Sequence, residues 1–302
     1  AVASGNVTLR NQALNQFQRL AQNESNLPAL RDSLLALGAE NPAFAPFVAS
    51  LGAVGTPAAQ SVLVELIAKS GNEWRVFCAV VPVFGLLEMP SEDTISFLQS
   101  TAQHPDPDFS WAAQLALGSV VHTLSKTNES RGASLLQDYL SKLEKPWKDE
   151  EELKGALAVL GNAGLTQSAS LIMPLTQHPR SDVRADALMA LRFIRTPETE
   201  QRMMDRLEND SSADVRMRAV DAIIHGPVPQ SVLGIAKKLL AHGNRTPHEL
   251  REKLLDVFLH AELGEPARKE LSEWVTRFIS SESEGAVRNK AAVVVQELQR
   301  SR

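Results

Sequence analysis

An internal repeat with a period in the mid-thirties runs along this chain. The sequence LGAVG at residues 51–55 recurs as LGNAG at 160–164, about three periods later. HPDPD at 104–108 recurs as HPRSD at 178–182, about two periods later. Repeats of this length are typical of solenoids, in which each unit buries its apolar face only by stacking on its neighbours.

Each unit contains two predicted helices. In residues 181–210 the apolar positions keep helical spacing, and Thr196-Pro197 then starts a second helix, because proline is best tolerated at a first helical position. Counted in this way, the chain contains about 17 helices and no strand, paired in roughly eight to nine units. The predicted fold is therefore an all-α, HEAT-like, two-layer right-handed α-solenoid.

The turns between the predicted helices are short and contain proline or glycine, for example at 55–57, 145–146 and 226–227. None is long enough to link two domains, so we expect one domain over residues 1–302. The chain begins at Ala1 without a methionine or a signal peptide, which suits either a mature form or a piece of a longer protein.

Composition excludes several classes of protein. The net charge of −5 disfavours a nucleic-acid binder that depends on a basic field. The longest charge-free run, 41–64, contains three prolines and two glycines, so it does not predict a membrane span. The one cysteine, Cys78, excludes an intrachain disulfide. Because it lies in the apolar run 76–80, we expect a buried small hydrophobe rather than a nucleophile.

Charge is distributed unevenly along the chain. Residues 1–123 contain 15 charged side chains, whereas residues 124–302 contain 52. Two interpretations are open: the N-terminal helices are more buried within the chain, or they pack on a partner, another copy or a missing domain. The second predicts that the weakly charged half is the main contact surface, and the helix expected at residues 57–67 offers a test.

Five segments, taken in order and spacing, resemble one family. They are VGTPAA at 54–59, LALGSVVH at 115–122, LGNAG at 160–164, HPRSDVR at 178–184 and SSADVRMRAVDA at 211–222. Together they are similar to the α-helical superhelix of the large lipid transfer proteins, which include vitellogenin, apolipoprotein B and the large subunit of microsomal triglyceride transfer protein.

The resemblance implies an architecture and a role as a scaffold or clasp. Members of that family carry a β-barrel before the superhelix and lipid-cradling sheets after it, and this chain has no strand-patterned segment for either. The resemblance therefore implies lipid carriage only for a full-length protein.

The residues that most often carry chemistry predict no catalytic, cofactor or metal site. Only His248-Glu249 forms a His-Glu pair, whereas a metal hydroxylase on a HEAT fold needs several such pairs. His104 and His178 fall at equivalent His-Pro turns, so they are expected to mark repeat boundaries.

An aspartate–arginine pair recurs with the repeat. Asp182 and Arg184 are matched by Asp214 and Arg216, while Arg251 and Val287-Arg288 continue the series. We expect these residues to cap helices and to bridge adjacent units rather than to act in acid–base chemistry.

The tryptophans, at positions 74, 111, 147 and 274, are dispersed and have no accompanying basic cluster, which also disfavours nucleic-acid binding. Trp74 and Trp111 are one period apart and are expected to fill equivalent packing sites.

Asn-x-Ser/Thr occurs at positions 6, 23, 128, 209 and 244. This pattern weakly favours a secreted or periplasmic protein and leaves a cytoplasmic one open.

The leading hypothesis is a non-enzymatic scaffold of the lipid-transfer type that clasps a lipid-bearing or protein partner through its weakly charged half. The alternative is a general HEAT-repeat scaffold for protein–protein interaction, and an enzyme on a HEAT fold ranks third. The contact residues, the partner and the lipid stay open at this point.

Overall fold

The computed structural model describes residues 7–144 and 150–300. In these ranges it contains 17 α-helices, three short 3-10 helices and no strand. The all-α fold predicted from the repeat is confirmed. The turn expected at 145–146, Trp147 and the Asn-x-Thr at position 6 lie outside the described residues.

The helices group into two compact units, residues 1–163 (unit 1) and 164–302 (unit 2). That the two form one domain stays a prediction. The α-helices of unit 1 are α1 Val7–Ala21, α2 Leu27–Leu37, α3 Phe44–Gly52, α4 Pro57–Lys69, α5 Trp74–Phe84, α6 Glu92–Thr101, α7 Pro107–Thr127, α8 Glu129–Glu144 and α9 Glu150–Ala163. Those of unit 2 are α10 Ala169–Leu175, α11 Ser181–Ala190, α12 Pro197–Asn209, α13 Ala213–Ile224, α14 Gln230–Ala241, α15 His248–His260, α16 Glu265–Ser281 and α17 Gly285–Gln299. The 3-10 helices are η1 Glu24–Asn26, η2 Thr166–Ser168 and η3 Gly243–Arg245.

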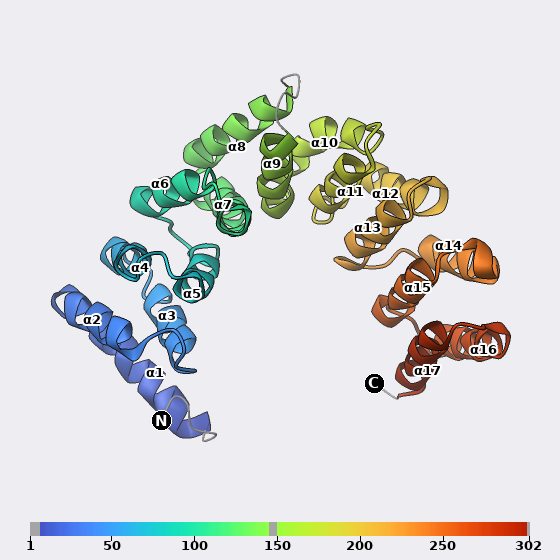
Figure 1. The fold of residues 1–302 in the computed structure, drawn as a ribbon, viewed down its shortest axis with the longest axis horizontal. Helices are drawn as coiled ribbons and strands as arrows, with labels where there is room; N and C mark the ends of the chain where they lie inside the picture. The colour runs from blue at the N-terminus through green and yellow to red at the C-terminus, as the bar shows by residue number, and fades with distance from the viewer. Residues whose placement is uncertain (1–6, 145–149, 301–302) are drawn as a thin grey trace. The chain divides into compact units, whose positions relative to one another are not determined.

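Unit 1 has two layers of helices (Figure 1). The odd-numbered helices α1, α3, α5, α7 and α9 pack in sequence against one another and form the odd layer, whereas α2, α4 and α6 form the even layer. The core lies between them, because each helix turns its apolar stripe toward the opposite layer. In α4, for example, Val62, Leu63, Leu66 and Ile67 are buried.

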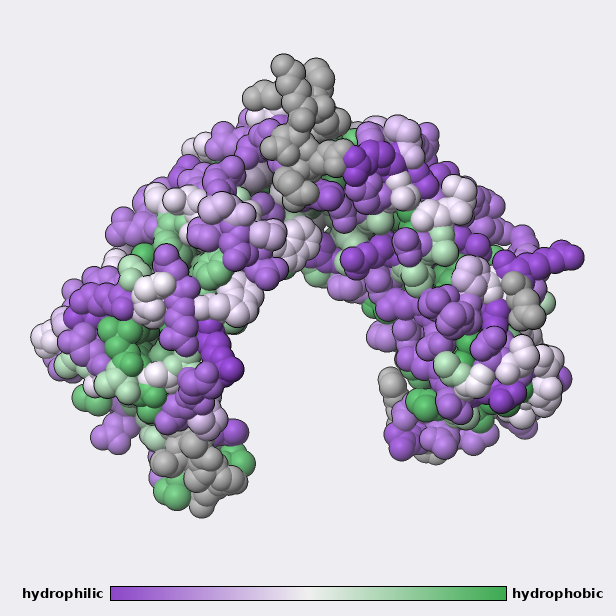
Figure 2. All heavy atoms as spheres, in the orientation of Figure 1, coloured by the Kyte–Doolittle hydropathy of each residue, from purple (hydrophilic) through white to green (hydrophobic). Residues whose placement is uncertain are grey.

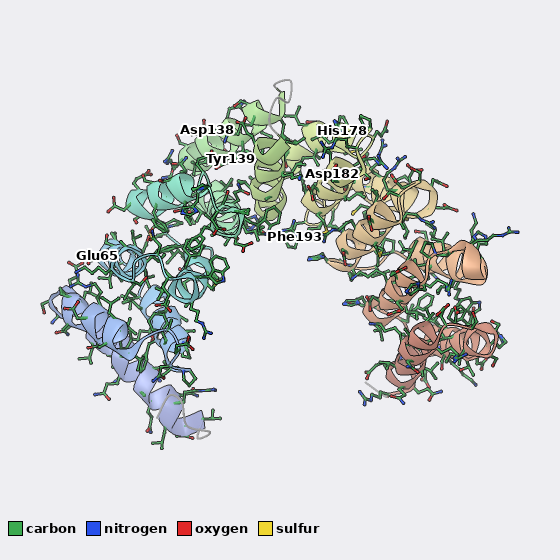
Figure 3. The ribbon with its side chains drawn as sticks, viewed as in Figure 1. Glu65, Asp138, Tyr139, His178, Asp182 and Phe193 are labelled. Carbon is green, nitrogen blue, oxygen red and sulfur yellow. The ribbon has the colours of Figure 1, made fainter. Side chains whose placement is uncertain are left out.

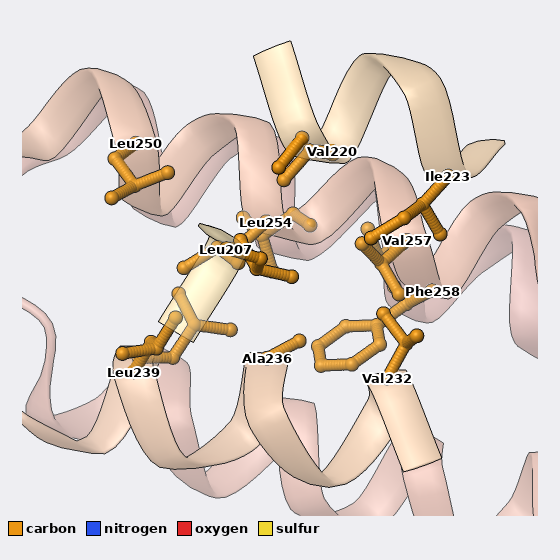
Figure 4. Packing of buried hydrophobic residues seen from close by; sticks show 14 of the residues in the cluster. Leu207, Val220, Ile223, Val232, Ala236, Leu239, Leu250, Leu254, Val257 and Phe258 are labelled. Carbon is orange, nitrogen blue, oxygen red and sulfur yellow. The ribbon is translucent and has the colours of Figure 1, made fainter. Parts of the chain in front are cut away.

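Unit 2 repeats this plan, with α11, α13, α15 and α17 in its odd layer and α10, α12 and α14 in its even layer. Figure 4 shows how side chains from both layers interdigitate: Leu207 of α12 and Val232 of α14 meet Val220 of α13 and Leu254 and Phe258 of α15. All five are buried.

Local sequence sets the helix ends. Thr196 is the N-cap of α12: its hydroxyl accepts from the Thr199 N–H, and the Thr199 hydroxyl accepts from the Thr196 N–H, with Pro197 at the first helical position. This is the start predicted from Thr196-Pro197. Thr56 and Pro57 start α4 in the same way, and Gly55, with φ +73°, supplies the left-handed residue in the turn before it.

Candidate interaction surface

Exposed apolar side chains are concentrated in the weakly charged part of the chain. Among the described residues nine large apolar side chains are exposed, and seven of these lie before residue 124. They are Val7, Leu9, Leu20, Trp74, Leu86, Met89 and Trp111; the other two are Phe193 and Val293. In Figure 2 the largest green area of the visible face likewise lies over the N-terminal helices of unit 1. Low charge in this half therefore accompanies apolar surface, and does not only reflect burial within the chain.

An apolar stripe runs along the exposed side of α5. Trp74, Cys78, Pro82 and, in the following turn, Leu86 are exposed at intervals of four residues. Such spacing places them on one side of the helix. The opposite side, which includes Phe77, is buried. A helix that is apolar on both sides either lies inside a larger assembly or presents one face to a partner.

Cys78 corrects a sequence prediction, because it is exposed rather than buried. The run 76–80 is apolar throughout. Four of its five residues are buried or half-buried in α5, and Cys78 is the exposed one. Burial of part of the side chain and the negative charge of Asp108 raise the pKa of the Cys78 thiol. The thiol is therefore not activated as a nucleophile.

The turn that follows α5 carries the two most exposed apolar residues, Leu86 at 82% and Met89 at 76%. The fully buried Gln60 of α4 holds this turn in place. Its Nε2 donates to the carbonyls of Gly55 (2.9 Å) and Met89 (2.8 Å), and its Oε1 accepts from the Ser91 N–H (2.8 Å) and from the Thr94 hydroxyl (3.0 Å). All the hydrogen-bonding positions of one buried amide are thus used, and two of them bind the backbone of this turn. The exposed side chains of Leu86 and Met89 therefore extend from an ordered turn.

The helix expected at residues 57–67 is not part of this surface. In α4 the large apolar residues Val62, Leu63, Leu66 and Ile67 are buried, and only smaller positions such as Pro57 are exposed. For this helix low charge reflects burial within the chain. The exposed apolar residues lie instead on α1, on α5 and its following turn, and on α7.

Trp74 and Trp111 do not fill equivalent packing sites, contrary to the sequence prediction. Trp74 is the first residue of α5, whereas Trp111 is the fifth residue of α7. Trp74 contacts Phe77 and Phe109. Both tryptophans stay about half exposed, at 42% and 48%.

The two His-Pro turns use their histidines as backbone acceptors. His104 Nδ1 accepts from the Asp106 N–H at 3.1 Å, and His178 Nδ1 accepts from the Arg180 N–H at 3.3 Å. His178 lies at the turn before α11 in Figure 3. The bond requires an unprotonated Nδ1, so both rings hold the turn that connects one helix to the next, as expected for repeat boundaries.

The remaining histidine candidate is exposed. His248 Nε2 lies 3.3 Å from Glu249 Oε1, and both side chains are more than half exposed. Within residues 7–144 and 150–300 no group of three or more histidine, cysteine, aspartate or glutamate side chains is placed to hold a metal. No helix in the same ranges is long and apolar enough to cross a membrane.

Two of the sequence motifs lock α7 to α9. A Cβ on Gly118 would lie 2.5 Å from the Val159 carbonyl oxygen, so only glycine permits this approach of the two helices. Asn162 Nδ2 donates to the Leu115 carbonyl (2.6 Å) and to Ser119 Oγ (2.8 Å). His122 Nδ1 lies 2.7 Å from the Ala163 carbonyl oxygen. The segments LALGSVVH and LGNAG are therefore the two halves of one contact inside unit 1.

These same segments fall within a match to a known family. The model described as the Vitellogenin TPR domain matches residues 8–244. The chain belongs to the Vitellogenin TPR domain family. The match confirms the resemblance drawn from the motifs and covers all of unit 1 from residue 8 onward.

Comparison of the chain with curated proteins found no match. Two solved structures are similar to it at low TM-scores. One is the archaeal HEAT-like repeats protein from Thermococcus onnurineus NA1, at TM-score 0.40 and 16% identity, covering 80% of this chain and 98% of that one. The other is human deoxyhypusine hydroxylase in complex with glycerol, at TM-score 0.29 and 13% identity, covering 91% and 96%.

In three of the four odd-layer helices of unit 2, α11, α15 and α17, an arginine near the start of the helix binds the turn that precedes it. Arg184 Nη1 donates to the carbonyls of His178 and Pro179, and Arg288 Nη1 to those of Glu282 and Ser283. The repeated arginines are therefore used in the structure of the repeat.

Two of these arginines also bind the next turn along. Arg184 forms a two-bond ion pair with Asp210, at 2.9 and 2.8 Å, and Arg251 pairs with Glu282. Arg216 departs from the series, because its Nε donates only to the Leu207 carbonyl at the end of α12. Arg184 and Arg251 bridge consecutive turns by ion pairs, whereas Arg216 joins α13 to the end of α12 through one backbone bond.

The odd layer of unit 2 carries paired charges. Lys253 of α15 lies 2.5 Å from Asp221 of α13 and 3.7 Å from Asp256, and Lys290 of α17 lies 2.6 Å from Asp256. Each of these charges has an opposite charge beside it. The exposed Phe193, labelled in Figure 3, packs edge-on against His225 and lies under the Arg192 guanidinium.

Proposed function

We propose that this chain is a non-enzymatic scaffold that clasps a lipid-bearing or protein partner through its weakly charged half, residues 1–123 of unit 1. The single observation that carries the proposal is the group of apolar side chains exposed on α5 and the following turn. Trp74, Leu86 and Met89 are exposed there, within residues 1–123, which contain 15 charged side chains. Interface centres are depleted of charged residues and enriched in tryptophan and methionine.

The held turn strengthens the case for a contact role. Two hydrogen bonds of Gln60, to the Met89 carbonyl and from the Ser91 N–H, fix the backbone around Met89. A contact residue that is already ordered loses less conformational entropy on binding. Exposing Leu86 and Met89 from an ordered turn is costly in water and favours association.

A non-enzymatic role is supported by what the reactive side chains do. His104 and His178 accept backbone bonds in turns, and Arg184 and Arg251 are engaged in ion pairs. Lipid carriage would belong to a longer protein of which this chain is the helical part. The alternative, a general scaffold for protein–protein interaction, makes the same use of unit 1.

Site-directed photo-crosslinking in the producing cells tests the proposal. A benzophenone amino acid is placed at Met89 in the full chain, and at Val293 of unit 2 as an equally apolar, exposed control. We expect a defined adduct from position 89 and none from position 293. Mass spectrometry of the adduct then separates lipid transport, which gives a lipid, from scaffolding, which gives a polypeptide. Equal yields at the two positions would refute the assignment of unit 1.

A further inference from the structure

The N-terminal ends of α5 and α7 meet in a cluster of aromatic rings. Trp74 stacks on Phe77 with ring centroids 5.7 Å apart and planes at 18°. Phe109 of α7 lies 4.9 Å from Trp74 and 4.5 Å from Phe77. The His104 ring covers Phe109 at 4.9 Å. Trp74 is thus supported on the side of its neighbours and still 42% exposed.

Two carboxylates are sequence neighbours of the ring residues. Glu73 immediately precedes Trp74, and Asp108 lies one turn before Trp111 on α7. Asp108 also acts electrostatically on Cys78, which places it at the α5–α7 boundary. Neither the Glu73 nor the Asp108 carboxylate has an ion-pair or hydrogen-bond partner in the part of the chain that the structure describes.

The cation next to Trp74 in the sequence is paired with another residue. Arg75 follows Trp74 directly, but its guanidinium pairs with Glu40. Asp106 uses its Oδ1 to cap the Asp108 N–H at 2.9 Å. This end of unit 1 therefore presents aromatic surface and unneutralised negative charge together, unlike the paired charges on α13, α15 and α17.

We propose that this aromatic edge, formed by Glu73, Trp74, Asp108 and Phe109, binds a cationic amphipathic segment of a partner polypeptide. The proposal rests on the scaffold function proposed above and names the chemistry of the partner. Charge complementarity selects this occupant, because two unpaired carboxylates attract a positively charged segment and repel a negatively charged one. Lysine or arginine over an indole face adds a cation–π contact, and the apolar side of the segment covers the exposed rings.

Binding of designed peptides to the full chain tests the proposal. The probe is an amphipathic helical peptide of leucine and lysine, about five turns long, and its control is the same peptide with glutamate in place of lysine. Calorimetry at about 0.15 M salt should detect the lysine peptide, with an affinity that falls as salt rises. The double variant Glu73→Gln, Asp108→Asn should weaken it about tenfold. Asp214→Asn, which removes an exposed carboxylate on α13, should leave it unchanged.

Failure of the cationic partner and failure of the scaffold function are distinguished by the peptide measurements and the Met89 crosslink. Equal binding of both peptides, or a lysine-peptide affinity that the double variant does not change, would overturn the cationic partner. So would sedimentation showing that the aromatic edge joins two copies of the chain. If the crosslink at Met89 persists in these cases, the scaffold function stands without this partner; if it is also absent, both fail. Trp74→Ala supplies an independent arm, with an expected loss of about fivefold.

Discussion

Arg251 and Glu282 form an ion pair that is almost fully enclosed. Arg251 Nε lies 3.0 Å from Glu282 Oε2, and the two side chains are 2% and 3% exposed. Arg251 Nη1 also donates to the carbonyls of Gly243 and Thr246, so the pair joins the turn before α15 to the turn before α17. Removing one member of such a pair leaves a buried charge without a counter-charge.

We therefore expect Arg251→Ala to lower the free energy of unfolding by about 3 to 5 kcal/mol. Arg216→Ala should cost on the order of 1 kcal/mol, because Arg216 makes one backbone bond, to Leu207 at 2.9 Å, and no ion pair in the described residues. Urea denaturation of the two variants gives the comparison. Equal losses would show that the enclosed pair is not the stronger bridge.

The second prediction concerns acid. Burial raises the pKa of Asp210, but hydrogen bonds from Arg184 and the Ser212 N–H, with the charges of Arg184 and Arg206, outweigh burial and hold that pKa below its usual range. A depressed folded-state pKa stabilises the fold above the unfolded value, near about 3.9. This stabilisation is lost as the pH falls through the folded value.

Asp210→Asn should therefore destabilise the protein at pH 7, by about 3 kcal/mol, since the side chain is 1% exposed. The difference from the unmodified chain should shrink as the pH is lowered below about 4. Urea midpoints measured from pH 7 to pH 3 check this. Asp214→Asn, on an exposed carboxylate, provides the control, and a difference that stays constant over this range would contradict the prediction.

The sequence predicted those features that depend on local chemistry and on the repeat. Thr196-Pro197 begins α12, the His-Pro turns connect helices, and Arg184 bridges turns as expected. Which face of α5 is exposed to solvent could not be predicted in the same way. The run around Cys78 is apolar on every side of α5, so its periodicity does not show which side meets the core.

The position of Cys78 gives the third prediction. Only the thiolate reacts with a maleimide, and burial and the Asp108 charge raise the pKa of this thiol. Under native conditions Cys78 should be labelled completely, but severalfold more slowly at neutral pH than a free cysteine. Asp108→Asn should speed labelling, whereas Asp214→Asn should not. Mass spectrometry over time follows the reaction, and labelling only after unfolding would show that Cys78 is buried.

The fourth prediction concerns the turn held by Gln60. Gln60→Leu removes four hydrogen bonds and leaves the Met89 carbonyl and the Ser91 N–H without this partner. We expect a loss of about 2 kcal/mol in unfolding free energy. Limited proteolysis should also cut near Leu86 and Met89 faster, by about tenfold, because the turn opens locally. A lower stability without faster cleavage there would mean that Gln60 does not hold the turn.

The last prediction separates contact surface from core in the weakly charged half. Leu63 of α4 is fully buried, whereas Leu86 is 82% exposed. Leu63→Lys should therefore unfold unit 1, because it places a charge in the core at a cost of several kcal/mol. Leu86→Lys should change the unfolding free energy by less than about 0.5 kcal/mol, as surface substitutions usually do. It should nevertheless abolish the photo-crosslink from Met89, because it puts a charge into the proposed interface. Thermal melts and crosslinking of the same two variants provide both measurements. A crosslink that survives Leu86→Lys would place the partner elsewhere on unit 1.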